Sequence, residues 1–243
     1  MILSFNIEYR TNWGEEVKLA GLSTESTPMY TTDGIYWTAE VELEVPQEGL
    51  TIHYSYQIEQ NGIVIRKEWN NFPRCLFLSG TPRKKYRIND CWKNIPEQLY
   101  LYSSAFTEAL LSHPERVDIP QGYKKGLIIK AYAPRINKDY CLAICGNQKA
   151  LGNWDPEKAV LMSDSNFPEW QVELDASKLK YPLEYKFILC HKQERKIDCW
   201  EKNPNRYLAD PEIKTNETLV ISDRYVYFDI PIWKGAGIAI PVF

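Results

Sequence analysis

Two tryptophans in the second half of the sequence stand where an indole ring can meet a ligand. In the segment 196–201, Ile197 and Cys199 share one strand parity and Trp200 has the other, so Trp200 is expected to face outward. Trp154 lies in the segment 151–156, whose Gly, Asn and Pro residues predict a turn that exposes the ring. Such flat apolar faces stack on other flat surfaces, including sugar rings, although either ring can instead cap the end of a folded domain.

Polar side chains near these rings have the chemistry that hydroxyl groups require. Lys186 is flanked by Tyr185 and Phe187 of the opposite parity and is therefore predicted to point outward. Glu201 and Asn205 lie in the polar loop that follows Trp200. Charged and amide groups of this kind donate to or accept from ligand hydroxyls. Two simpler interpretations remain open: Lys186 as a solvated strand lysine and Asn205 as a turn residue.

Alternating apolar residues predict that strands position these groups. Leu3, Phe5, Ile7 and Tyr9 have one parity and polar residues have the other, which is typical of a half-buried strand. The same period recurs in the segments 37–43 and 170–174, where Trp37 and Trp170 are in register with apolar residues. We therefore expect an all-β fold in which these two tryptophans belong to the core.

The length of 243 residues is comfortable for two domains of ordinary size. Trp37 is matched by Trp170, Tyr54-Ser55-Tyr56 by Tyr185-Lys186-Phe187, and Trp69 by Trp200, each about 130 residues further on, which indicates a diverged duplication. A short helix is predicted at Ser104–Leu111. The expected organisation is a first β-sandwich at 1–100, a partly helical connector at 101–123, a second β-sandwich at 124–230, and the start of a truncated following domain at 231–243.

Composition excludes several classes of function. The formal charge of −3, with mixed signs along the chain, provides no basic stripe for nucleic acid. The N-terminal residues do not resemble a secretory signal, and no stretch of the sequence is long and apolar enough to span a membrane. The six cysteines include no Cys-x-x-Cys pair, and reduced thiols in a cytoplasmic protein are expected.

The motifs of the second half together resemble the family 20 starch-binding module. They are Gly146, Leu151-Gly152-x-Trp154, Trp170, Tyr185-Lys186-Phe187-Ile188 and Trp200-Glu201-x-Asn203-Pro204-Asn205-Arg206. The resemblance implies an open, immunoglobulin-like β-sandwich. It also implies a first α-glucan site with Trp154 and Trp200 as its rings and Lys186, Glu201 and Asn205 as its polar groups.

The first half resembles the same family through fewer residues. It has Trp37, Tyr54-x-Tyr56 and Trp69, but it lacks the Leu-Gly-x-Trp turn and has Ser55 where the lysine is expected. Trp69 shares the parity of Ile63 and Ile65, so it is either buried or a ligand residue. The segment 11–17, with Trp13 followed by Gly14, is similar to the second glucan site of the family.

Two such modules followed by the segment 235–243 are similar to the start of 4-α-glucanotransferases of the amylomaltase class. We therefore expect non-catalytic binding of an α-1,4-glucan such as starch, glycogen or maltodextrin, next to a covalently following catalytic domain. No catalytic residue, metal or cofactor is expected.

A pair of structural sandwiches that mediates contacts between domains or subunits is the alternative, because exposed aromatic residues also suit protein interfaces. A hydrolase is disfavoured because Asp139, Glu169 and Glu184 do not belong to a recognisable catalytic motif.

Overall fold

A computed structural model describes residues 1–69, 73–81, 84–94, 121–133, 136, 139–194, 196–222, 226 and 228. The helix expected at Ser104–Leu111, most of the connector and the segment 231–243 lie outside these residues. Within the described part, no helix is long and apolar enough to cross a membrane. The described regular structure is almost entirely β, as the alternating sequence predicts.

The first half is a sandwich of two sheets. One layer contains β1 (Ile2–Glu8), β4 (Tyr36–Glu42) and β8 (Lys85–Cys91). The other contains β2 (Glu15–Ala20), β3 (Thr27–Pro28), β5 (Leu50–Gln60), β6 (Ile63–Lys67) and β7 (Arg74–Leu78). Leu3, Phe5 and Ile7 of β1 are buried between the layers, which confirms the parity expected for this strand.

The second half repeats this arrangement. One layer contains β9 (Lys125–Tyr132), β12 (Ser163–Asn166), β13 (Glu169–Asp175) and β17 (Glu217–Ser222). The other contains β10 (Tyr140–Gly146), β11 (Val160–Leu161), β14 (Leu183–His191), β15 (Ile197–Trp200) and β16 (Arg206–Leu208). Short 3-10 turns are η3 (Lys149–Trp154), η4 (Pro156–Lys158) and η5 (Ala176–Lys178).

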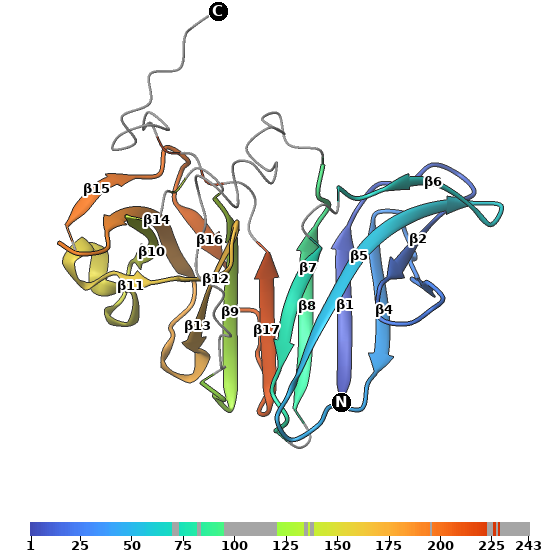
Figure 1. Ribbon diagram of the computed structural model, residues 1–243, viewed down its shortest axis with the longest axis horizontal. Coiled ribbons are helices and arrows are strands. Elements are labelled where there is room, and N and C mark those ends of the chain that lie inside the picture. The colour runs from blue at the N-terminus through green and yellow to red at the C-terminus, as the bar shows by residue number, and fades with distance from the viewer. Residues whose placement is uncertain are drawn as a thin grey trace, which may run out of the picture.

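One continuous sheet joins the two halves. Strand β17 pairs in parallel with β9 on one side and with β8 on the other, which gives a seven-stranded sheet in the order β12-β13-β9-β17-β8-β1-β4 (Figure 1). Val220 packs into the core of the first half, whereas the next residue back, Leu219, packs into the core of the second half. Because successive side chains of a strand point to opposite faces, the two remaining sheets cover opposite faces of the shared one.

A buried polar network lies at this junction. Arg74 pairs with Glu68 at 2.7 Å and with Asp90 at 2.9 Å, and the Ser222 hydroxyl, which comes from the second half, donates to Asp90 at 2.6 Å. Across the same junction, Lys130 Nζ of β9 donates to the backbone carbonyl of Cys75 in β7. The halves are therefore tied together by side chains as well as by strand pairing.

The two halves share specific contacts as well as topology. The indole N–H of Trp37 donates to the carbonyl of Tyr9, and that of Trp170 donates to the carbonyl of Ala133, each at 3.2 Å. Both tryptophans are buried, as their parity predicts. A repeated hydrogen bond of the same type at matched positions is the contact pattern expected of a duplicated sequence.

Candidate functional site

Trp154 and Trp200 lie next to one another at one end of the second half. Their ring centroids are 6.2 Å apart and their planes are inclined by 45°. Trp154 is the last residue of η3 and Trp200 is the last residue of β15. The fold therefore brings together rings that are far apart in the sequence. Both side chains are partly exposed. Together they form a bent aromatic surface.

The turn that presents Trp154 depends on left-handed backbone. Gly152 has φ of +83°, and Asn153 and Trp154 follow with φ of 52° and 60°. A Cβ on Gly152 would lie 2.9 Å from the carbonyl oxygen of Lys158, so the turn also needs the space that glycine leaves. A bulky residue such as Trp154 rarely adopts positive φ, and such strain is often found where a side chain must be held in a functional orientation.

Lys186 lies on the outer face of β14. Its neighbours Tyr185 and Phe187 are buried while Lys186 is partly exposed, which confirms the predicted parity. Its ammonium donates to the backbone carbonyl of Glu201 at 3.3 Å. The contact holds this cation next to the residue that follows Trp200.

Glu201 occupies a different position from the one expected of a sugar ligand. Only 2% of the residue is exposed, and its carboxylate accepts from the Phe187 amide at 2.8 Å and from two nitrogens of Arg206 at 3.1 and 2.9 Å. Asn203 donates to the same carboxylate at 3.1 Å. The expectation of direct contact with a ligand is therefore replaced by a structural role, in which Glu201 anchors the loop after Trp200.

Asn205 lies in that same loop and is exposed. The following residue, Arg206, is held by Glu201 and begins β16. Asn205 is thus carried on an anchored loop at the end of the strand that bears Trp200. The structure leaves its ligand role as a prediction.

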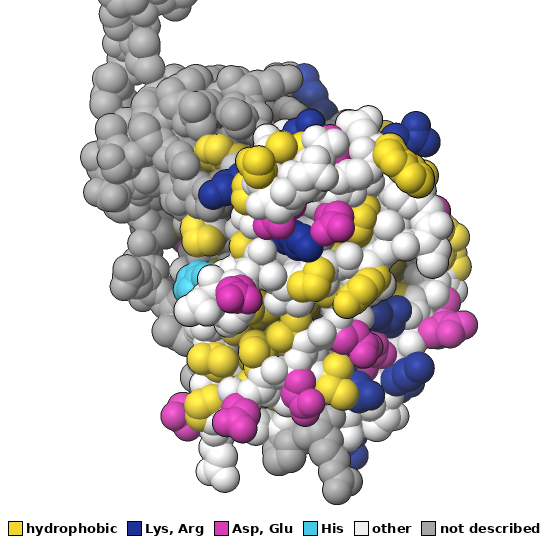
Figure 2. Space-filling view, turned by 90° about the vertical axis from the view of Figure 1, so that its right-hand side faces the viewer, with side chains coloured by type: hydrophobic (Ala, Val, Ile, Leu, Met, Phe, Trp, Pro, Cys, Tyr) yellow, Lys and Arg dark blue, Asp and Glu magenta, His cyan; other side chains and the backbone are white. Residues whose placement is uncertain are grey.

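Trp13 and Gly14 lie in the turn between β1 and β2, and Trp13 is 100% exposed. Glu15 closes this turn by accepting from the Asn12 amide at 2.8 Å and from its side chain at 3.0 Å. These hydrogen bonds from Asn12 hold the pKa of the Glu15 carboxyl below its usual value. Figure 2 shows the face of the first half that lies at the right of Figure 1, where hydrophobic side chains are interspersed with acidic and basic ones.

Tyr30, which is 70% exposed, is not among the residues predicted from the sequence. The turn that follows Tyr30 is hydrogen-bonded to the turn of Trp13, because the Thr11 amide donates to the Gly34 carbonyl at 3.0 Å. Tyr30 precedes the Thr31-Thr32-Asp33-Gly34 segment. This turn-forming composition is the same signal that predicts the exposure of Trp154, and it also predicts an exposed Tyr30.

The structure overturns the expected match between Trp69 and Trp200. Glu68 accepts from the Tyr56 amide and pairs with Arg74, as Glu201 does with Phe187 and Arg206.

Strand register gives the same alignment. Lys67 pairs with Gln57, the residue after Tyr56, and Trp200 pairs with Ile188, the residue after Phe187. The first half therefore has Lys67 where the second half has Trp200, because the order Trp-Glu in one half is Glu-Trp in the other. Trp69 instead lines a cavity at the junction of the two halves.

Glu169, one of the carboxylates named for the hydrolase alternative, belongs to a buried ion pair. Glu169 pairs with Lys130 at 2.8 Å, and both side chains are buried. Burial acts to raise the pKa of Glu169, but the charges of Lys130 and Lys93 outweigh it and hold the pKa below the ordinary value. Glu169 is thus committed to the junction between the halves.

Part of the chain matches a family model. Residues 129–220 match the model of a family described as "Starch binding domain". Over 99% of its length the chain is 23% identical to the protein named "4-alpha-glucanotransferase DPE2" from Oryza sativa subsp. japonica, and it spans 27% of the length of that relative.

Solved structures give partial matches. The glucoamylase of Hypocrea jecorina is 24% identical with a TM-score of 0.35, and the match covers 46% of this chain and 19% of that one. The family 20 module of a maltotetraose-forming amylase from Pseudomonas saccharophila is 18% identical with a TM-score of 0.33, covering 40% of this chain and 99% of that one.

Proposed function

We propose that the chain binds an α-1,4-glucan at the Trp154–Trp200 pair, since residues 129–220 match the model of a starch-binding domain family. The observation that carries this proposal is the pair of partly exposed indoles at 6.2 Å and 45°. Each ring offers an apolar face to the apolar face of one glucose unit. No bond is made or broken, so the site acts by holding its ligand.

The inclination of the rings favours an α-linked chain over a flat one. Successive glucose units of an α-1,4-glucan are inclined to one another because the chain curves, whereas a β-1,4-glucan is an extended ribbon. Two surfaces inclined by 45° match a curved ligand. Lys186, held next to Glu201, then donates to hydroxyl groups at the edge of the bound sugars.

Binding at a single site of this kind is expected to be weak, since two stacked sugars and a few hydrogen bonds must offset the loss of ligand freedom. The chain spans 27% of a relative named as a 4-alpha-glucanotransferase. We infer that this region holds a glucan close to a glucanotransferase domain of the same polypeptide. Linkage of that kind raises the effective concentration of the substrate.

Calorimetric titration of the 243-residue chain with β-cyclodextrin tests the proposal. Wild type should release saturable heat, and Trp200→Ala should remove it while the circular dichroism spectrum stays unchanged. Ile63→Ala is the matched control, because it deletes an exposed apolar side chain of the first half outside the pair. Maltohexaose should bind and cellohexaose should not. Absence of heat for wild type at millimolar ligand would overturn the proposal.

A structural role in contacts between domains or subunits remains the second candidate. It is favoured by the continuous sheet and by the exposed apolar residues Ile63 and Ile65 of β6. It predicts self-association that depends on protein concentration and does not respond to sugar. Sedimentation velocity with and without maltohexaose separates the two candidates.

A cytoplasmic location is proposed on the state of the thiols. All six cysteines are free, and burial raises the pKa of Cys190 to about 11. Burial raises the pKa of the Cys75 thiol as well. Thiols of this kind are poorly reactive and need no oxidising compartment.

A further inference from the structure

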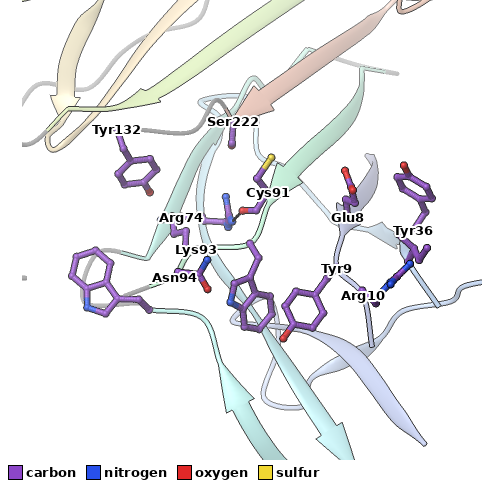
Figure 3. Close-up of a pocket in the computed structure, with 13 residues that line it drawn as sticks. Glu8, Tyr9, Arg10, Tyr36, Arg74, Cys91, Lys93, Asn94, Tyr132 and Ser222 are labelled. Carbon is purple, nitrogen blue, oxygen red and sulfur yellow. Dashed lines mark hydrogen bonds between the residues drawn. The ribbon is translucent and has the colours of Figure 1, made fainter. Parts of the chain in front are cut away.

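A cavity of about 660 Å³ lies at the junction of the two halves, away from the Trp154–Trp200 pair. Most of its wall comes from the first half, at the ends of β1, β4, β7 and β8. Tyr132 of β9 and Ser222 of β17 are contributed by the second half (Figure 3). The volume is within the range of sites that bind small molecules.

Aromatic side chains line much of this cavity: Tyr9, Tyr36, Trp69, Trp92 and Tyr132. Tyr9 and Trp92 are in contact, with ring centroids 4.3 Å apart and planes inclined by 41°. Arg66 also contacts Tyr9, because its guanidinium lies 5.9 Å from the centroid of the Tyr9 ring and donates to its hydroxyl. Tyr9 is thus held in place, with Trp92 beside it.

Polar side chains of mixed charge complete the lining. Figure 3 shows Glu8, Arg10 and Tyr36 together at one end and Lys93 and Asn94 nearer the middle. Glu8 and Arg10 are both exposed at this end. A carboxylate next to a guanidinium favours neither an anionic nor a cationic ligand, but the two groups together offer hydrogen-bond acceptors and donors.

The two buried cations of the cavity are already occupied or partly neutralised. Arg74 is paired with Glu68 and Asp90. Burial, reinforced by the charge of Arg74, lowers the pKa of Lys93 to about 8. Lys93 Nζ also lies over the Tyr132 ring, 4.4 Å from its centroid. These contacts leave little free positive charge to attract a phosphate or carboxylate ligand.

We propose that this cavity binds a neutral oligosaccharide of two or three pyranose rings. A pyranose has an apolar face for the indoles and phenols and a rim of hydroxyls for groups such as Glu8, Arg10 and Asn94. A purely apolar ligand would leave the charged groups without partners. A charged ligand would lie near a group of like charge as well as one of opposite charge. Arg74, which lines the cavity, is held by Glu68 and Asp90, so it needs little ordering when a ligand binds.

This site is distinct from that of the proposed function, although the choice of an α-linked probe rests on that function. The experiment uses the full chain with Trp200→Ala, in which the first surface is disabled. Maltotriose is titrated by calorimetry into this variant, into Trp200→Ala/Trp92→Ala and into Trp200→Ala/Tyr36→Ala. Tyr36 is 63% exposed, so its replacement does not endanger the fold. Trp200→Ala/Ile63→Ala, which replaces an exposed side chain outside the cavity, is the matched control. Trp200→Ala/Trp13→Ala tests the segment that is similar to the second glucan site.

The proposal expects saturable maltotriose binding in Trp200→Ala. Adding Trp92→Ala should weaken it by more than about tenfold, and adding Tyr36→Ala by about fivefold, the order of a lost aromatic contact. Adding Ile63→Ala should leave it unchanged. Absence of binding in Trp200→Ala, or binding sensitive only to Trp13, would overturn the proposal. A wild type that binds maltotriose through Trp92 but not β-cyclodextrin would refute the proposed function and leave this one standing.

Discussion

Replacing Glu201 with alanine separates a structural role from contact with sugar. The Glu201 side chain is fully buried, and its partner Arg206 is 14% exposed. The substitution removes both hydrogen bonds from Arg206 and leaves the Phe187 amide without its acceptor. Breaking one partner of a buried pair costs about 3–5 kcal/mol, and we expect the lower end, about 3 kcal/mol, because Arg206 reaches solvent.

That loss is a large share of the stability of an ordinary domain. It should lower the urea midpoint by about 1 M, with unfolding followed by circular dichroism. The loop after Trp200 would lose its anchor, so β-cyclodextrin affinity should fall as well. In contrast, Trp200→Ala should abolish binding with a much smaller shift of the midpoint.

Glu68→Ala is the matched variant of the first half. Glu68 makes the same contacts with the Tyr56 amide and Arg74, so the urea midpoint should fall at least as far. Its β-cyclodextrin affinity should remain that of wild type while the protein is folded, because the Trp154–Trp200 pair is untouched. If Glu201→Ala keeps the wild-type midpoint and yet loses binding, Glu201 contacts the sugar directly and the structural reasoning is wrong.

Three further outcomes follow from the junction and the turn. Lys130→Met should destabilise both halves in a single unfolding transition, by about 3 kcal/mol, because it strands a buried carboxylate; separate transitions by fluorescence and circular dichroism would contradict the shared sheet. Lys93, with its pKa lowered to about 8 from 10.5, binds fewer protons in the folded state than in the unfolded state. The free energy of unfolding of wild type should therefore rise from pH 8 towards pH 10 relative to that of Lys93→Met. If urea unfolding gives the same slope of this free energy against pH for both proteins, the reasoning is wrong. Gly152→Ala should weaken β-cyclodextrin binding by displacing Trp154, whereas Gly62→Ala, at a similar φ of +76° but with nothing within 4 Å, should not.

Local periodicity was sufficient for the strands and for the direction of several side chains. Leu3, Phe5 and Ile7 are buried, Trp37 and Trp170 belong to the cores, and Lys186 points outward. These features depend on a period of two that any strand must obey. The motifs around Trp154 and Trp200 carried the family resemblance, and residues 129–220 match that family.

Side-chain partners were beyond the reach of the pattern. Glu201 looks like a loop carboxylate next to an aromatic residue, and only the fold shows that Phe187 and Arg206 occupy it. In the same way, similar spacing matched Trp69 with Trp200, although a shift of register puts Lys67 at that position. Sequence spacing does not count the residues that a loop or bulge absorbs.

The sequence by itself determined the all-β class, the two cores and the exposure of part of Trp154 and Trp200, because alternation and turn composition are local properties. Only the tertiary structure decided that β17 inserts between β8 and β9 and makes one sheet of the two halves. That pairing joins strands from distant parts of the chain through backbone hydrogen bonds, which are the same for every side chain and leave no motif. The cavity shared by Tyr132, Ser222 and the first half follows from that pairing alone.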